Sequence, residues 1–343
     1  GGVGVISCAG IGLIYPKFSN DYRTNSIMGL REEIRKARAK TSGVIGVNIM
    51  VALSNFADMV RTAIEEKADI IFSGAGLPLD LPSYLGEKSS TKLVPIVSSA
   101  RAAHIICEKW KTNYNYLPDA IVVEGPKAGG HLGYKNTQIE DDNFSLERLI
   151  PEVVATADRF AAQHAHPIPV IAAGGLYTGE DIYRIMSLGA AGVQMGSIFV
   201  TTTECDASET FKKTYIEIVA RPVGMPGRAI GGEFLRKVKA GLTRPKRCPF
   251  HCIKTCDYPK SPYCIILALY NAAKGNLSRG YAFAGANAYL SKKITSVKET
   301  IESLKAGFQA AAGRNTPAHQ YGRTPAIALN SHQRRPRPPR TAT

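Results

Sequence analysis

The segment VVEGPKAGGHLGY, residues 122–134, combines an ionisable side chain with several glycines. His131 follows Gly129 and Gly130 directly, and Gly133 comes two residues later. An imidazole can accept a proton near neutral pH without an extreme change in its pKa, so it suits a general base. Two interpretations are open: the loop is only a tight turn, or it holds a catalytic histidine against a bound ligand.

Glycine also recurs where other short apolar runs end, so that the glycine-rich ends are SGAG (73–76), VEGPKAGGHLG (123–133), AAGG (172–175) and QMGS (194–197). If these runs are parallel strands, their carboxyl ends meet at one edge, where a (β/α)8 barrel builds its active site. Glycine lets the backbone approach a ligand and offers amide N–H groups to phosphate oxygens. Tight βα turns alone also require glycine. Its repetition at successive strand ends favours a phosphate-bearing ligand.

Polar residues close several of the same runs. Asn48 lies within the apolar stretch GVNIMV, and Glu124 ends the run before the glycine-rich loop. A buried polar side chain needs a hydrogen-bond partner, which is either internal or a ligand. Ser98 and Ser99 close another run, and each could contact a ligand or cap the helix that follows.

Short apolar runs alternate with amphipathic segments along the first two hundred residues. The runs that predict strands are residues 1–7, 43–51, 69–74, 92–99, 119–125, 168–175 and 191–197. Their alternation with helices predicts an α/β fold with a parallel sheet covered by helices on its outer face. Since a closed barrel needs eight units and the chain opens inside a strand-like run, we expect a TIM (β/α)8 barrel lacking its first N-terminal strand. An open doubly wound sheet is the alternative.

The composition changes twice along the chain. We expect an N-terminally incomplete barrel domain over residues 1–207 and a smaller helical substrate region over 208–310, with helices in 208–220 and 296–310. Residues 311–343 form a basic tail rich in proline and arginine, which has too little apolar content to fold. A cloning or frameshift artefact is a second explanation of this tail.

The net charge of +15 first suggests a polyanionic partner. Six arginines and no acidic residue lie in 313–343, and the remaining excess is spread thinly over the chain, so no nucleic-acid partner is expected. No apolar run is long enough to cross a membrane, and no membrane partner is expected. An odd number of cysteines, seven, favours a reducing, cytoplasmic location over a disulfide framework.

Four of the cysteines are close in sequence, with His251 among them: Cys248, Cys252, Cys256 and Cys264. Such a group could bind zinc or an iron–sulfur cluster. Its spacing matches no standard finger or ferredoxin pattern, so reduced structural thiols are the preferred interpretation and no metal is predicted. No serine or cysteine nucleophile motif, Walker loop or HExxH sequence competes with His131 for the chemistry.

Several of these motifs together resemble the nitronate monooxygenase (2-nitropropane dioxygenase-like) family, which is related to the flavin-dependent enoyl-acyl-carrier-protein reductases. The resemblance extends over about residues 1–310 and is carried by residues 43–51, 73–78, 122–134, 168–176 and 191–199. It implies an FMN-containing TIM barrel with a smaller helical substrate domain. The chain departs from the family pattern at Pro126 and Lys127, in ending a strand MGS instead of MGT, and in lacking the first strand with its GGM motif.

Carried across by motif, the resemblance assigns the catalytic histidine to His131. The FMN-binding residues that it implies are Asn48, Gly74, Ala75, Gly76, Ser98, Glu124, Gly129, Gly130, Ala173, Gly174, Gly175, Met195, Gly196 and Ser197. Of these, Gly174, Gly175, Gly196 and Ser197 would hold the phosphate.

The implied activity is oxidation of alkyl nitronates by FMN and O2 to carbonyl compounds and nitrite. His131 would remove the α-proton of a neutral nitroalkane or bind its nitro oxygens, while VGMPGRAIGGEF and the cysteine-rich segment would cover the pocket. The partners expected are a small-molecule substrate, O2 and a second copy in a homodimer. An NAD(P)H-dependent enoyl-thioester reductase is the alternative enzyme, and a non-catalytic flavin- or nucleotide-binding protein is the alternative outside enzymes.

Overall fold

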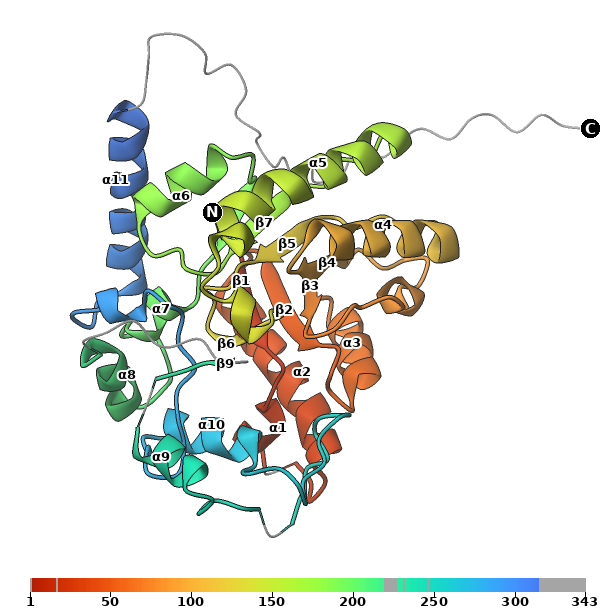
Figure 1. Cartoon of the computed structure of the whole chain (residues 1–343). Coiled ribbons are helices and arrows are strands. Elements are labelled where there is room, and N and C mark those ends of the chain that lie inside the picture. Colours follow the sequence, from red (N-terminus) through yellow and green to blue (C-terminus); the bar gives the residue numbers. More distant parts are fainter. Residues whose placement is uncertain (1, 17, 219–226, 231, 246, 315–343) are drawn as a thin grey trace, which may run out of the picture.

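The sheet at the centre of the molecule is parallel and follows the chain order. A computed structural model describes residues 2–16, 18–218, 227–230, 232–245 and 247–314. Its larger sheet has the order β1-β2-β3-β4-β5-β7-β8 (Figure 1). The strands are β1 (Gly4–Ser7), β2 (Ile45–Met50), β3 (Ile70–Gly74), β4 (Lys92–Val97), β5 (Ile121–Glu124), β7 (Val170–Ala173) and β8 (Gly192–Gln194). This order has no reversal, so the barrel-type prediction is favoured over a doubly wound sheet, whose order changes direction at a switch point.

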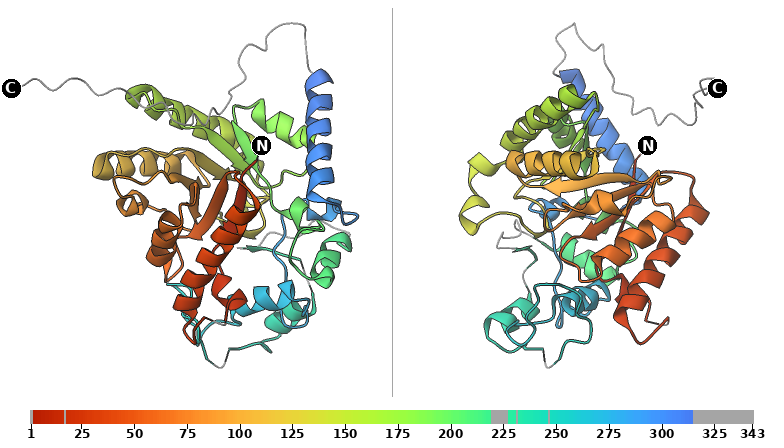
Figure 2. Two further views of the ribbon diagram at one scale, coloured as in Figure 1. Left: turned by 180° about the vertical axis from the view of Figure 1, so that it is seen from behind. Right: turned by 90° about the vertical axis from the view of Figure 1, so that its right-hand side faces the viewer.

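Helices connect successive strands of the sheet. They are α1 (Ile11–Ile14), α2 (Tyr22–Lys40), α3 (Phe56–Glu65), α4 (Ala100–Tyr114), α5 (Leu146–His164) and α6 (Gly179–Met186). Local capping fixes where several begin: the Asp21 carboxylate accepts the Thr24 N–H at 2.8 Å, and the Ser99 hydroxyl accepts the Ala102 N–H at 3.2 Å. Figure 2 shows α2 to α5 on the outside of the curled sheet.

Two apolar layers lie on the two faces of the sheet. The outer layer joins strand residues such as Ile49, Ile71 and Val123 to helix residues such as Trp110 and Ile150. The inner layer is smaller and contains Phe72, Val94, Ala120, Val122 and Ala173, with Ile70, Ile96 and Ile171 packed against them. Because successive strand residues point to opposite faces, this division also fixes which polar side chains point inward.

The curled sheet is a half-barrel among the described residues. β1 pairs with β2 and β8 with β7, and neither strand has a second neighbour in the part of the chain that the structure describes. Val3 and Val5 at this edge are 43% and 45% exposed. The parallel α/β sheet is therefore confirmed, while the absent first strand of an eight-stranded barrel stays a prediction.

Short helices and loops follow the last strand. They are α7 (Ser197–Val200), α8 (Glu209–Ile216), α9 (Glu233–Lys239), α10 (Ile265–Ala273) and α11 (Val297–Arg314). Helix α11 packs on α6 so closely that a Cβ on Gly179 would lie 2.1 Å from the Leu304 carbonyl oxygen. The helices predicted in 208–220 and 296–310 are thus present as α8 and α11. The domain boundaries stay a prediction, and residues 315–343 of the tail lie outside the described residues.

Candidate active site

Three polar side chains point inward where the strands end. In the sheet register Asn48 lies beside Phe72 of the inner layer, Glu124 beside Ala173, and Ala173 beside Gln194. Strand alternation therefore directs the Asn48, Glu124 and Gln194 side chains to the inner face. Polar groups thus line the inner face at the carboxyl edge of an otherwise apolar layer.

These inward polar groups have no hydrogen-bond partner in the part of the chain that the structure describes. Asn48, Glu124 and Gln194 are half-buried, and among the described residues none of their side chains makes a hydrogen bond. Burial raises the pKa of the Glu124 carboxyl to about 7, so this group is both a hydrogen-bond donor and an acceptor near neutral pH. Polar groups left in this state suit a ligand that supplies the missing partners.

Gln194 was missed by the sequence analysis, which selected its neighbour Met195. The structure packs Met195 against the outer apolar layer, so its side chain points away from the inner face. The signal that could have found Gln194 is the period of two along β8, since Val193 and Met195 share the outer layer.

The predicted glycine turns require small residues for two reasons, close packing at Gly74 and positive φ angles at Gly76, Gly174 and Gly175. Gly74 lies in the inner layer, where a Cβ would be 2.9 Å from the Cβ of Ile96, and Ala75 and Gly76 follow with φ of 55° and 124°. Gly174 and Gly175 have φ of 98° and 79°, a conformation that glycine adopts without strain. The strand-end loops are therefore held close together and twisted in ways that require small residues.

The last two of these loops present free backbone donors. Among the described residues, no carbonyl or side chain accepts the N–H groups of Gly175, Gly196 or Ser197. A Cβ on Gly196 would meet nothing within 4 Å, so the space beside it is open. The Ser197 hydroxyl accepts the Gly285 N–H at 2.9 Å and keeps its own proton to donate. Free N–H groups, a hydroxyl and open space fit a phosphate.

Two predicted serines have structural roles in the described fold. Ser99 caps α4, as one of its two interpretations expected. The Ser98 hydroxyl lies 3.4 Å from the Gly133 carbonyl oxygen and donates to it, so it braces the far end of the glycine-rich loop. The Tyr134 hydroxyl in turn donates to the Glu124 carbonyl at 2.6 Å, which closes the loop on its own strand.

His131 lies in a short ribbon at the end of this loop. β6 (Gly130–His131) pairs antiparallel with β9 (Gly227–Arg228), and Figure 1 shows both outside the larger sheet. The imidazole packs edge-on against Phe283 with ring centroids 5.2 Å apart, and within the described residues its nitrogens make no hydrogen bond. Partial desolvation lowers the pKa of His131 below its usual value, so the ring is neutral at pH 7 and can accept a proton.

Arg228 anchors this ribbon from the β9 side. Its side chain is 1% exposed, and one guanidinium nitrogen lies 3.2 Å from the Pro126 carbonyl oxygen and 3.3 Å from Glu140. A buried guanidinium that bonds the loop backbone restricts how far His131 can move. Sequence reasoning selected the surrounding segment as a cover but no residue in it, because nothing local distinguishes Arg228 from other arginines.

The cysteine-bearing segment lies over a different strand end. Leu53, just after β2, forms an antiparallel bridge with Ile253, and the Lys254 ammonium donates to the Val51 carbonyl at 2.9 Å. No three histidine, cysteine or acidic side chains within the described residues are arranged to hold a metal ion. In the described fold the segment is attached to the loop after β2, and its role as a cover of the pocket stays a prediction.

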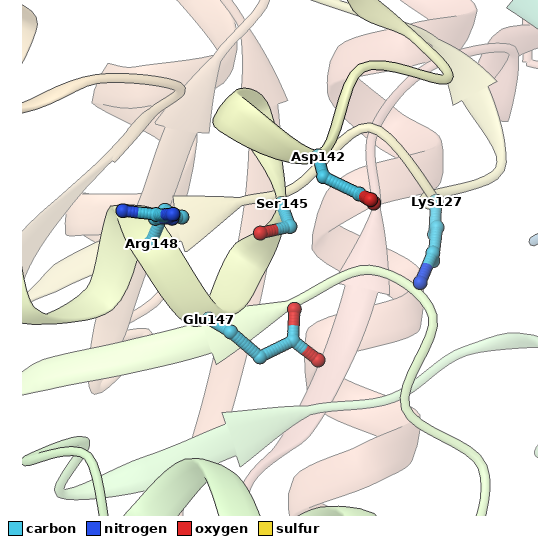
Figure 3. Close-up of a pocket in the computed structure, with 5 residues that line it drawn as sticks. All are labelled: Lys127, Asp142, Ser145, Glu147 and Arg148. Carbon is cyan, nitrogen blue, oxygen red and sulfur yellow. The ribbon is translucent and has the colours of Figure 1, made fainter.

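A separate hollow of about 340 Å³ is lined by one residue of the glycine-rich loop and by residues at and just before the start of α5 (Figure 3). Lys127 reaches it from the loop, opposite Asp142, while Ser145, Glu147 and Arg148 come from the start of α5. Its charges are mixed, and Glu147 is paired with Arg184 outside the lining. None of the inward polar groups of the sheet lines this hollow, so it is not where the predicted site residues gather.

The parallel half-barrel sheet and its polar carboxyl edge define an α/β protein with a TIM-barrel-like fold, whose strand-end loops offer N–H groups suited to a phosphate. A family model for nitronate monooxygenase matches residues 54–307, and the chain belongs to this oxidoreductase family. No helix in the described part of the chain has the length and apolar character needed to cross a membrane.

Individual curated relatives carry more than one name. A nitronate monooxygenase of Paraburkholderia phytofirmans is 26% identical over 81% of this chain and 84% of its own length. A (3aS,4S,5R,7aS)-5-hydroxy-7a-methyl-1-oxo-octahydro-1H-indene-4-carboxyl-CoA dehydrogenase of Mycobacterium tuberculosis is 28% identical over 64% of this chain and 57% of its own. The chain spans about half the length of the first curated relatives it matches, between 51% and 57%.

Solved structures show the same fold. A variant of FabK from Thermotoga maritima has a TM-score of 0.67 and 26% identity, covering 91% of this chain and 93% of that one. A nitroalkane oxidase from Streptomyces ansochromogenes also has a TM-score of 0.67, with 18% identity and coverage of 92% and 91%.

Proposed function

We propose that this chain binds FMN and oxidises alkyl nitronates with O2 to carbonyl compounds and nitrite. The observation that carries the proposal is the set of half-buried polar groups at the carboxyl edge of the sheet that have no partner among the described residues. Inward Asn48, Glu124 and Gln194 and the free N–H groups of Gly175 and Gly196 all lack protein partners among the described residues. Membership of the nitronate monooxygenase family supports FMN as the group that satisfies them.

The cofactor site divides into a phosphate end and a ring end. The turns at Gly174–Gly175 and Gly196–Ser197 hold the phosphate, because their N–H groups and the Ser197 hydroxyl are available there. The ring end consists of Asn48, Gly74, Ala75, Gly76, Glu124, Gly129 and Gly130. When bound, FMN supplies the redox chemistry, and the protein orients the substrate and excludes competing reactions.

His131 is the proton-handling group in this proposal. Its imidazole is neutral at pH 7 and has an unoccupied nitrogen in the described fold, so it removes the α-proton of a neutral nitroalkane. The resulting imidazolium then lies beside a nitronate anion, which it stabilises by charge. With a preformed nitronate, the same ring binds the nitro oxygens instead.

Three further parts of the proposal concern the whole protein. An eighth parallel strand pairs with the free edges of β1 and β8 and closes the barrel. At the β1 edge it covers Val3 and Val5, which are exposed in the described fold. Residues 208–310 form the substrate region, beside the barrel domain of residues 1–207. The protein acts in the cytoplasm on a small molecule and O2, as a homodimer.

A second candidate activity is NAD(P)H-dependent reduction of an enoyl thioester. It is favoured by the likeness to FabK, an enoyl-ACP reductase, at a TM-score of 0.67 and 26% identity. The same inward groups would hold FMN in both reactions, so the two candidates differ in the substrate and in the electron donor.

A spectrum and two assays test these candidates. The protein is incubated with FMN, desalted and examined for a flavin absorbance band. Oxygen uptake that depends on a nitronate and not on NAD(P)H supports the first activity, whereas NAD(P)H-dependent reduction of a crotonyl thioester supports the second. Failure to retain flavin contradicts both.

A matched pair of variants tests the phosphate end alone. Gly196 has a φ of −122° and open space beside it, so both Gly196→Asn and Gly196→Asp can be accommodated. Only the aspartate places a negative charge against the phosphate. We expect the Asp variant to lose FMN at least tenfold more readily than the Asn variant, as measured by equilibrium dialysis, on the order of 1 kcal/mol of repulsion. Equal affinities would place the phosphate elsewhere.

A further inference from the structure

Residues 284–287 run across the carboxyl edge of the sheet from the C-terminal part of the chain. The Gly285 N–H donates to the Ser197 hydroxyl at 2.9 Å, and the Ala286 N–H donates to the Lys127 carbonyl at 2.9 Å. One short segment thus bonds the loop after β8 and the loop after β5. The sequence analysis did not select it.

The segment is packed without slack. Ala284, Ala286 and Ala288 are 1%, 0% and 0% exposed. A Cβ on Gly129 would lie 2.7 Å from the Gly285 nitrogen. Because the two backbones are in contact, neither can shift without displacing the other. The segment therefore restrains the positions of the loops after β5 and β8.

Asn287 extends the segment to a third loop. Its amide nitrogen donates to the Gly175 carbonyl at 2.6 Å. That peptide unit is planar and trans, so fixing its carbonyl also fixes the Leu176 N–H on the opposite side. Among the described residues the Leu176 N–H has no acceptor, like the Gly175 N–H before it.

The Gly174–Gly175 turn needs such a hold. Two consecutive glycines with positive φ have many conformations available, and only some of them present their N–H groups together. A turn that must order itself on binding loses affinity, whereas a turn held in place beforehand does not. The Asn287 amide restrains this turn through its hydrogen bond to the Gly175 carbonyl oxygen.

We propose that Asn287 is a positioning residue for the phosphate of the cofactor, acting through the Gly175 carbonyl. The inference rests on the proposed binding of FMN, but it adds a residue more than a hundred positions from the turn that it orders. The role of Asn287 is confined to the phosphate end of the cofactor site. Its amide bonds the Gly174–Gly175 loop and makes no bond to Asn48 or Glu124 at the ring end.

Riboflavin has the flavin ring but no phosphate. Comparing its binding with that of FMN therefore shows whether Asn287 acts on the phosphate loop or stabilises the whole site. The affinities of the apoprotein for FMN and for riboflavin are measured by fluorescence quenching in the wild type, in Asn287→Ala and in Asn276→Ala. Asn276 is exposed and serves as the matched control. We expect Asn287→Ala to weaken FMN binding about tenfold, the size of one lost hydrogen bond, with riboflavin within about twofold of the wild type.

Each other outcome has a definite meaning. Equal weakening of FMN and riboflavin, or no weakening of either, overturns the role of Asn287 and leaves the proposed FMN site intact. A wild type that binds FMN no more tightly than riboflavin overturns the phosphate site itself. If Asn287→Ala does not fold, Asn287→Leu keeps the volume without the donor, and the same ratio of affinities decides.

Discussion

The glycine-rich loop of residues 125–133 and the cysteine-bearing segment of residues 248–264 are the two segments that the sequence analysis considered for catalysis and for metal binding. The structure uses them differently. The first follows Glu124 at the end of β5 directly, and His131 lies seven residues further on in β6. The second bonds the loop after β2 mainly through its backbone, and its thiols have unequal environments: Cys252 is buried and Cys256 is exposed.

The difference between these two segments comes from what fixes their positions. A parallel sheet brings the carboxyl ends of all its strands to one edge, so residues after a strand must meet residues after its neighbours. No such constraint acts on an irregular segment, where a regular spacing of cysteines need not bring the thiols together. Reactive residue types therefore predict a site when the topology also makes them converge.

The largest expected effect comes from the two histidines of these segments. We expect His131→Ala to lower turnover of neutral nitroalkanes by about 10²–10⁴-fold, the usual contribution of a general base, while FMN remains bound. His251→Asn is the control, because His251 is exposed and its φ of 43° is one that asparagine tolerates. Steady-state oxygen uptake measures both variants. A similar loss in both, or unchanged turnover in His131→Ala, would contradict the role of His131.

Two cationic side chains that bond loop carbonyls provide the next comparison. Arg228→Met removes a guanidinium that is 1% exposed and leaves the Pro126 carbonyl without that donor, so we expect unfolding free energy to fall by about 3 kcal/mol. Lys254→Met removes an exposed ammonium from the Val51 carbonyl, and we expect a loss below about 1 kcal/mol. Urea unfolding followed by circular dichroism measures both. Equal losses would mean that the two segments are anchored alike.

The pH dependence of stability separates the segments again. Burial raises the pKa of Glu124 from 4.5 to about 7, so between these values the folded protein binds a proton that the unfolded chain releases. Stability is therefore lost as pH rises through this window, by roughly 2 kcal/mol between pH 5 and pH 8. Glu124→Gln should remove this part of the slope. In the cysteine segment, burial raises the pKa of Cys252 to about 12, so that thiol does not titrate there. A Gln variant with the wild-type slope would show that Glu124 is not desolvated.

The strands and the glycine turns could be predicted from the sequence because their signals are local. Short apolar runs mark each strand, most of them with a glycine at one end, and Asn48 and Glu124 stand inside or at the end of such runs. Gln194 was within reach through the period of two along its strand. Arg228 and Asn287 were not, because their partners Pro126 and Gly175 lie 102 and 112 residues away and only the folded chain brings them together.

The smallest effects are expected from substituting the cysteines. Whether Cys252 and Cys256 contribute unequally to the unfolding free energy distinguishes structural thiols from a shared metal site. If the thiols are structural, Cys252→Ser places a hydroxyl in an apolar cluster with Tyr22 and Ile266, and we expect a loss of about 1 kcal/mol. Cys256→Ser, at an exposed position, should cost less than about 0.5 kcal/mol. A shared metal would make the two substitutions similarly costly, and a chelator would lower the stability of the wild type to match. Urea unfolding with and without EDTA distinguishes these cases, because unequal losses that EDTA does not change leave the segment as a cover held by packing.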